Sequence, residues 1–311
     1  MISIPSFLDT ARPPLPNIVI PRGVLPFHLP DQPVRGRLVR LGPLADALLS
    51  RHSNPSAISK LAGEALALTA GVAAGLKFQG SFSLHAKGNG PLAVLFADCT
   101  NHGALRFYAR LAGAKDTISA QASAHMLLGD GVLAFTVDQG PATAPYQGIV
   151  AIEGTSLADI ATHYFAVSEQ LPAFVRLAAG ETPSGWRAGG LMLERIATTG
   201  NACEEDAWEE VTALAGTVTN EELLDDLITS EGLLHRLFHG TNMRVESPRP
   251  LSFGCRCSRA RLSSVLERFP PNELDEMAIN GEIVMTCEFC NCDFRFSRDE
   301  LQGRTRTGGI K

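Results

Sequence analysis

Two things are scarce in this 311-residue chain: aromatic side chains, which make up 6% of it, and excess positive charge. Its 27 Lys and Arg residues face 33 Asp and Glu residues, for a formal net charge of −6. Nucleic-acid-binding surfaces need clustered cations that neutralise phosphates. The composition therefore predicts no nucleic-acid partner, although a hydrophobic content of 45% is ample for a core.

Export and membrane signals are also missing. Residues 1–33 contain eight prolines and no positively charged start followed by an apolar stretch, so we expect a Pro-rich, partly irregular extension and no secretory signal. The longest apolar run, Leu61–Leu76, is interrupted by Glu64 and is shorter than the roughly 20 residues that span a bilayer. We therefore expect a cytoplasmic protein with no membrane partner, in which this run is a buried helix.

Catalytic motifs are lacking as well, because no phosphate-binding loop, metallohydrolase pair or nucleophile elbow fits its context. Residues 88–93 imitate a dinucleotide-binding fingerprint, but Pro91 leads into a strand-like segment and not into a helix. His163, and the pair His235 and His239, have no accompanying carboxylate or cysteine pattern. The sequence therefore predicts no enzyme and no catalytic residue.

Residues 34–200 mix helical and strand patterns. From Phe78 to Lys87 apolar and polar residues alternate, which is the period-two pattern of a half-buried strand. The pattern predicts helices at 44–49, 57–74 and 156–168, and further strands at 92–97, 105–111, 132–137, 146–152, 174–178 and 191–196. Because these strands do not alternate regularly with helices, they favour an α+β core domain over a doubly wound parallel sheet.

Residues 201–250 differ sharply in composition, since 11 acidic residues face three arginines, for a local charge of −8. Apolar residues recur there at helical spacing, and we expect three short helices, each with an apolar face that needs a partner. The preceding domain is the expected partner, and the segment is interpreted as a helical linker. The apolar positions are Trp208, Val211, Leu214, Leu223, Leu224, Leu227, Leu233, Leu234, Leu237 and Phe238.

Residues 251–311 are interpreted as a separate small lobe, with five of the seven cysteines and no histidine. Cys255-Arg-Cys257 and Cys287-Glu-Phe-Cys290 are two thiol pairs separated by 29 residues, and each pair can supply two ligands of a tetrahedral site. An all-cysteine zinc site is the simplest assignment, ahead of an iron–sulfur cluster. Structural zinc contributes roughly 10–16 kcal/mol to such small domains, so loss of the metal should unfold this lobe.

Two interpretations of the four cysteines remain open at this point. Most four-cysteine zinc sites are structural, which favours a constitutive zinc-ribbon binding protein. Zinc-bound cysteines are thiolates, however, and the thiolate is the form that attacks peroxide, so the same site is suited to sensing oxidants. The single residue between Cys255 and Cys257 is a shorter gap than zinc fingers usually have, and a disulfide there needs backbone adjustment, which would couple oxidation to unfolding.

The sequence resembles the redox-regulated heat-shock chaperones of about 33 kDa, also called the 33 kDa chaperonin family, from Val34 to about Leu301. Besides the cysteines, the motifs that carry this resemblance are Val34-Arg35-Gly36, Leu76-Lys77-Phe78, Gly88-Asn-Gly-Pro91, Tyr146-Gln-Gly-Ile-Val150, Glu153-Gly154, Ser168-Glu-Gln-Leu-Pro172 and Ala188-Gly-Gly-Leu-Met192. The resemblance implies a client-binding and dimerisation core over 34–200, a metastable acidic linker over 201–250 and a zinc-binding redox-switch domain over 251–311.

By this resemblance the protein is an ATP-independent holdase that binds unfolding proteins under oxidative or heat stress, as a homodimer when active. The reduced, inactive protein would hold one zinc through Cys255, Cys257, Cys287 and Cys290. Peroxide or hypochlorous acid would join Cys255 to Cys257 and Cys287 to Cys290, release the zinc and unfold the linker. An unfolded linker that is apolar yet highly charged could bind exposed apolar client surface and stay soluble.

The remaining cysteines depart from this pattern. Cys292 adds a thiol two residues after Cys290, where it could compete as a ligand or as a disulfide partner, so the pairing of Cys287 with Cys290 stays open. Cys99 and Cys203 lie outside the cluster, and we assign them no role because most lone cysteines are small buried hydrophobes.

Overall fold

The computed structural model describes residues 14–114, 118–140, 142–196, 202–298 and 300–301. The described residues form two compact units, one from Asn17 to Gly254 and one that contains the residues from Cys255 to Leu301. The irregular structure expected for residues 1–13 lies outside the described residues, as does the side chain of Cys203.

The larger unit is built on an eleven-stranded sheet with the order β7-β6-β3-β4-β5-β11-β1-β2-β9-β8, and β10 pairs with β1 beside this path. All pairs are antiparallel except β11 with β5. The expected α+β class is confirmed. The strands are β1 (Val19–Leu29), β2 (Val34–Arg40), β3 (Ser81–Gly88), β4 (Leu92–Thr100), β5 (Ala104–Leu111), β6 (Gly131–Asp138), β7 (Tyr146–Ala151), β8 (Ala173–Thr182), β9 (Gly185–Arg195), β10 (Arg244–Val245) and β11 (Arg249–Phe253).

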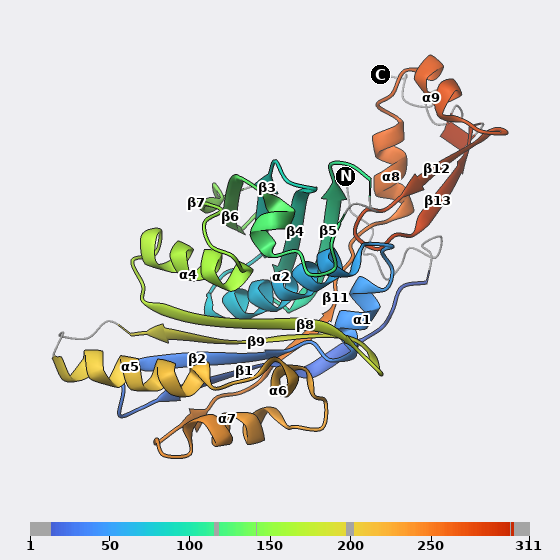
Figure 1. The fold of residues 1–311 in the computed structure, drawn as a ribbon. Helices are drawn as coiled ribbons and strands as arrows, with labels where there is room; N and C mark the ends of the chain where they lie inside the picture. Colours follow the sequence, from blue (N-terminus) through green and yellow to red (C-terminus); the bar gives the residue numbers. More distant parts are fainter. Residues whose placement is uncertain (1–13, 115–117, 141, 197–201, 299, 302–311) are drawn as a thin grey trace. The chain divides into compact units, whose positions relative to one another are not determined.

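One face of this sheet packs against the helices that precede the linker (Figure 1). They are α1 (Pro43–Leu49), α2 (Ser56–Gly75), α3 (Ala124–Leu128) and α4 (Leu157–Val167). Helix α2 has the length and composition of a membrane span, but 83% of its apolar window is buried inside the fold, as expected for a core helix. Helix α4 begins with a capping box in which Ser156 and Asp159 each accept a backbone N–H.

The opposite face packs against the three linker helices, α5 (Ala202–Gly216), α6 (Asn220–Leu224) and α7 (Ser230–Phe238). Successive residues of a strand point to opposite faces. Val24 therefore belongs to the core under α2, whereas its neighbour Leu25 packs with Leu234 and Phe238 in the core under the linker. Three helices thus lie in the expected linker and pack against the sheet. The expectation for Leu227 was wrong, because it lies in the turn between α6 and α7 and is 91% exposed.

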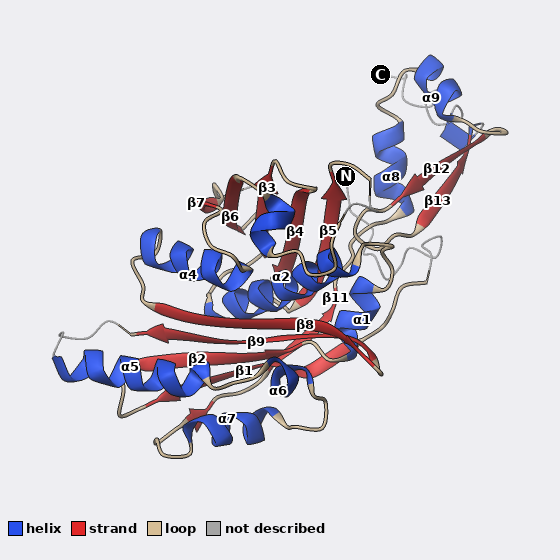
Figure 2. Ribbon diagram, in the orientation of Figure 1, coloured by secondary structure: helices blue, strands red, loops and turns tan. Residues whose placement is uncertain are grey.

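Two segments are more regular than their prolines suggested. Strand β1 occupies Val19–Leu29 within the Pro-rich extension, and it tolerates Pro21 because the register shifts between Ile20 and Val24. Strand β11 includes Pro250, and the sequence patterns predicted no strand there. This strand lies between β1 and β5, in the middle of the sheet (Figure 2).

The smaller unit contains helices α8 (Arg259–Leu266) and α9 (Pro271–Met277) and the antiparallel hairpin of β12 (Glu282–Thr286) and β13 (Asp293–Ser297). Alternate residues of the hairpin face inward, so Ile283, Phe294 and Phe296 are buried. Arg259 stacks over the Phe296 ring with its guanidinium carbon 4.4 Å from the ring centre. The core of this unit is therefore a small set of apolar side chains beside the cysteines.

Candidate metal centre

The first thiol pair lies immediately before helix α8. Ser258 follows Cys257 and caps this helix, because its hydroxyl accepts a hydrogen bond of 3.2 Å from the backbone N–H of Arg261. The cap fixes the direction of the chain directly after Cys255 and Cys257. Both thiols are thereby placed at the start of a regular element.

The second thiol pair lies in the turn between β12 and β13. The backbone N–H of Cys287 donates to the carbonyl of Cys292 at 2.9 Å, and the N–H of Asn291 donates to the carbonyl of Cys287 at 2.8 Å. Asn291 has a φ of 51°, in the left-handed region that Asn enters more readily than most residues. These features close the turn tightly around Cys287 and Cys290.

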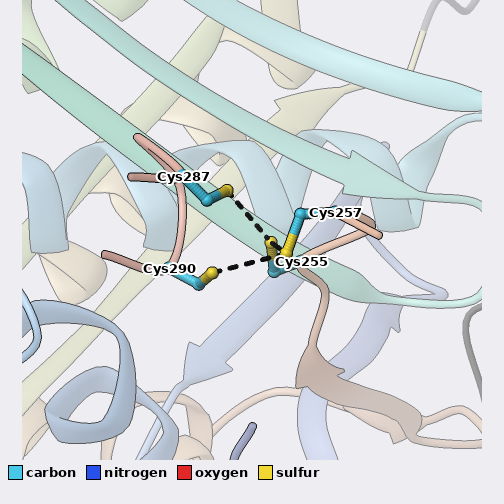
Figure 3. A group of neighbouring side chains, drawn as sticks. All are labelled: Cys255, Cys257, Cys287 and Cys290. Atoms are coloured by element: carbon cyan, nitrogen blue, oxygen red, sulfur yellow. Dashed lines mark hydrogen bonds between the residues drawn. The ribbon is translucent and has the colours of Figure 1, made fainter. Parts of the chain in front are cut away.

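The four cysteine sulfurs converge (Figure 3). The Sγ atom of Cys255 lies 3.3 Å from that of Cys257 and 3.7 Å from that of Cys287. The Sγ atoms of Cys257 and Cys290 lie 3.5 Å apart, and all four lie within 4.8 Å of one another. The two thiol pairs, separated by 29 residues in the sequence, therefore form one group.

This spacing fits a tetrahedral metal site. Four sulfurs at about 2.3 Å from a central zinc are about 3.8 Å from one another, which is the tetrahedral edge for that bond length. The measured separations of 3.3, 3.5 and 3.7 Å are close to this edge. The arrangement could hold a metal ion, and thiolates are ligands that zinc accepts without geometric strain.

The pKa shifts of the four thiols also favour a bound metal ion. Contact with the neighbouring thiols, chiefly Cys257, lowers the pKa of Cys255 to about 7. The pKa of Cys287 is also lowered, chiefly by Cys255, whereas the pKa values of Cys257 and Cys290 are raised, each chiefly by the Cys255 thiol. Crowded sulfurs cannot all ionise without a cation, because like charges disfavour one another. A divalent metal would supply that charge and hold all four as thiolates.

Cys292 is buried but does not belong to the group of four. Its Sγ atom lies 3.6 Å from the carbonyl oxygen of Cys290, and its own carbonyl accepts the N–H of Cys287. Competition between Cys292 and the four thiols stays a prediction. Cys99 is buried in the core of the larger unit, where it contacts apolar side chains.

Sequence reasoning missed the arginines that hold the linker. Arg187 on β9 pairs with Asp226 at 2.7 Å, and Arg195 pairs with Glu205 at 2.6 Å. Arg40 at the end of β2 donates hydrogen bonds to the backbone carbonyls of Leu223, within α6, and of Asp225, directly after it. The excess of acid in the linker was the available signal, but its partners are dispersed through the sequence. The acidic linker is thus matched by cations of the sheet.

Comparison with known proteins decides the family. Residues 23–297 match the family model described as Hsp33 protein.

The chain belongs to the Hsp33 family. A 33 kDa chaperonin of Caulobacter vibrioides is 41% identical over 275 residues, covering 85% of this chain and 91% of that protein. One from Ectopseudomonas mendocina is 35% identical over 280 residues, covering 88% and 92%. The crystal structure of the 33 kDa chaperonin of Thermotoga maritima superposes with a TM-score of 0.77 at 22% identity, over 92% of this chain and 98% of that one.

The resemblance expected from the sequence motifs is therefore confirmed. The Hsp33 relatives from Caulobacter vibrioides and Ectopseudomonas mendocina are named chaperonins and not enzymes. The Thermotoga structure supports the α+β fold.

Proposed function

We propose that this chain is a redox-regulated, ATP-independent holdase that binds unfolding proteins in the cytoplasm under oxidative or heat stress. In the reduced state Cys255, Cys257, Cys287 and Cys290 hold one zinc, and the protein is inactive. Oxidation pairs Cys255 with Cys257 and Cys287 with Cys290, after which these sulfurs no longer bind the metal. The active form is a homodimer.

The observation that carries this proposal is the convergence of the four sulfurs within 4.8 Å of one another. A bound zinc would supply positive charge that keeps all four as thiolates. Their unit has few buried apolar side chains, among them Leu266, Ile283 and Phe294. Small domains of this kind depend on their metal for folding, so its loss should unfold the hairpin and α8.

The chemistry of activation balances with peroxide as the oxidant. One thiolate attacks peroxide, which is reduced to water while the sulfur becomes a sulfenic acid. The neighbouring thiol displaces the hydroxyl, so a sulfur–sulfur bond forms and a second water is released. Each disulfide therefore removes two electrons from a cysteine pair and consumes one peroxide. The Sγ separation of 3.3 Å between Cys255 and Cys257 already places that pair close together.

The linker supports the proposal because its apolar face is covered in this structure. Leu233, Leu234 and Phe238 of α7 are buried against the sheet, and so is Val211 of α5. If the linker detached, these side chains and the sheet residues beneath them would face solvent. Exposed apolar surface of this kind binds apolar segments of other proteins.

Zinc release and suppression of a model client's thermal aggregation, measured on one sample, test the proposal. We expect reduced protein to retain about one zinc per chain and to suppress nothing. Protein treated with peroxide at raised temperature should release the metal and suppress aggregation. Retained zinc with oxidant-independent activity would instead favour a constitutive zinc-ribbon binding protein. Sedimentation of the oxidised protein tests the homodimer.

A further inference from the structure

Strand β7 forms one end of the large sheet (Figures 1 and 2). Within the described residues it pairs only with β6, from Tyr146 opposite Val137 to Ala151 opposite Val132. Its other edge therefore carries backbone N–H and C=O groups that no neighbouring strand satisfies. An unpaired edge of this kind is a template for another extended chain.

The sequence of β7 has none of the charges that usually protect such an edge. Tyr-Gln-Gly-Ile-Val-Ala contains no charged residue, and the uncharged stretch extends from Gln139 to Ile152. Pro145 bounds the strand but does not lie within it. Lysine, proline and bulges are the devices by which edge strands avoid pairing. The strand β7 itself thus carries none of these devices, and among the described residues no strand pairs with its outer edge.

Strand β8, at the opposite end of the sheet, differs from β7 in charge. Strand β8 carries Arg176 and Glu181, and helix α6 packs against it. Arg176 also donates a hydrogen bond to the side chain of Asn220, at the start of α6. Both edge strands contact a helix, α6 at β8 and α4 at β7, but only β8 carries charged residues of its own.

The outward face of β7 adds apolar surface to this edge. Ile149 is 55% exposed, and Val132 on the neighbouring strand is 44% exposed. Ala134 lies opposite Ile149 and Val132 lies two residues before it, so all three side chains share one face. An added strand would therefore gain apolar contacts beside its backbone hydrogen bonds.

The short length of the β7 edge favours a client segment over a second copy of the chain as the partner of this strand. Stable homodimers bury about 1,200–2,000 Å² or more, which pairing of a single six-residue strand does not approach. Gly148 near the centre of the strand offers no side chain to a cross-strand partner. Hydrogen bonds between backbones also depend little on the partner's side chains, so many different sequences can pair with the edge. These features suit weak, exchangeable binding to many sequences.

We infer that the free edge of β7 binds extended, uncharged apolar segments of unfolding proteins by adding them as a strand to the sheet. The inference rests on the proposed holdase function and names the class of segment that is held. This contact is present in both redox states and is weak by itself. Oxidation adds the surface beneath the linker, and two linked contacts bind far more tightly than either alone.

A matched pair of variants separates the edge from the apolar face. Ile149→Lys places a charge on the edge strand, whereas Val132→Lys places the same charge on the same face one strand inward. Both side chains are partly exposed, so both variants should fold. The probe is a fluorescent six-residue peptide of alternating valine and threonine. We expect Ile149→Lys to weaken its binding by about tenfold and Val132→Lys to weaken it by less than about twofold.

Two further measurements complete the test. The same peptide with N-methylated amides cannot donate to a strand edge and should not bind, and the unmodified peptide should slow amide exchange within residues 146–151. Equal binding of both peptides, or equal weakening by both variants, would overturn the inference. Peptide binding is measured on reduced protein as well, so a failure of oxidant-dependent aggregation suppression would count against the holdase proposal alone.

Discussion

Arg40, the last residue of β2, donates a hydrogen bond of 2.7 Å from Nη2 to the backbone carbonyl of Asp225. The same guanidinium donates to the carbonyls of Glu222 and Ile228. With the bond from its Nε to the carbonyl of Leu223, one side chain of the sheet therefore binds four carbonyls between Glu222 and Ile228. Planar, five-donor arginine is suited to such a convergent role.

Replacement of this arginine should loosen the linker without oxidant. Arg40→Gln leaves several partly buried carbonyls without their donor, at about 1–3 kcal/mol for each one that water does not reach. We expect faster proteolysis between α6 and α7 in reduced protein, and a lower free energy of unfolding. Arg110→Gln, on β5, is the control and should change neither. Unaltered proteolysis of Arg40→Gln would show that the apolar face and the ion pairs of Arg187 and Arg195 hold the linker without Arg40.

Gly189 on β9 permits the close approach of α6. A Cβ atom there would lie 2.7 Å from the carbonyl oxygen of Val39 and 3.1 Å from that of Leu223. Gly189→Ala should therefore displace the end of α6 and destabilise the protein by about 1–3 kcal/mol in chemical denaturation. Gly216→Ala, which meets no atom within 4 Å, should be neutral or slightly stabilising. Similar midpoints for both variants would contradict this packing argument.

Serine substitutions should separate the ligands from Cys292. Cys287→Ser and Cys290→Ser each remove one of four sulfurs, so zinc binding at pH 7 should weaken by at least about tenfold. Cys292→Ser should retain about one zinc per chain, since Cys292 lies outside the group of four. Titration with a chromogenic chelator gives the affinities. Loss of zinc from Cys292→Ser alone would make it a ligand.

Removal of the metal should unfold the smaller unit and leave the larger sheet folded. The sheet unit buries its own cores on both faces, one of them built around α2. Amide exchange of protein treated with a strong chelator should therefore lose protection over residues 255–301 while α2 keeps it. Protection that persists across the hairpin of β12 and β13 would mean that the cysteines are dispensable for its folding.

Glu64 on α2 should make stability depend on pH. Burial raises the pKa of its carboxyl group to about 7, against an opposing effect of Lys60. The folded protein then binds a proton that the unfolded chain releases near its ordinary pKa of 4.5, so stability falls as the pH rises from about 4.5 to about 7 and is level above that. Glu64→Gln should remove this slope and raise stability at pH 8 by roughly 1–3 kcal/mol. Parallel curves for both proteins between pH 4.5 and pH 8 would refute the assignment.

Most helices and strands of the larger unit could be predicted from the sequence, because the patterns that predict them lie within short segments. The alternation predicted from Phe78 to Lys87 is found in β3, which begins only at Ser81, and the apolar run from Leu61 lies in α2 as far as Gly75. Strand β11 was missed because it pairs with β1 and β5, and Pro250 within it favours loops. What places this strand is contact with distant residues, which local propensity does not encode.

The candidate metal site also has features that the sequence predicts and features that it does not. Spacing alone predicted that the two thiol pairs would act together, and the four sulfurs do converge. The position of Cys292 could not be predicted, because it depends on the backbone bond between Cys287 and Cys292 and on the left-handed Asn291. The arginines that hold the linker, such as Arg187, were also missed, since they come from strands far away in the sequence.

The central position of β11 has a consequence for how the linker can move. The linker leaves the sheet after β9 and returns to it first at β10, which pairs with β1, and then at β11, so both of its ends are fixed in the same sheet. When it unfolds it becomes a closed loop of about 50 residues, whose closure entropy rises only slowly with length. A client bound to such a loop stays beside the sheet, and refolding needs no search by a free end. Return to the resting state is therefore an intramolecular step whose rate is independent of protein concentration.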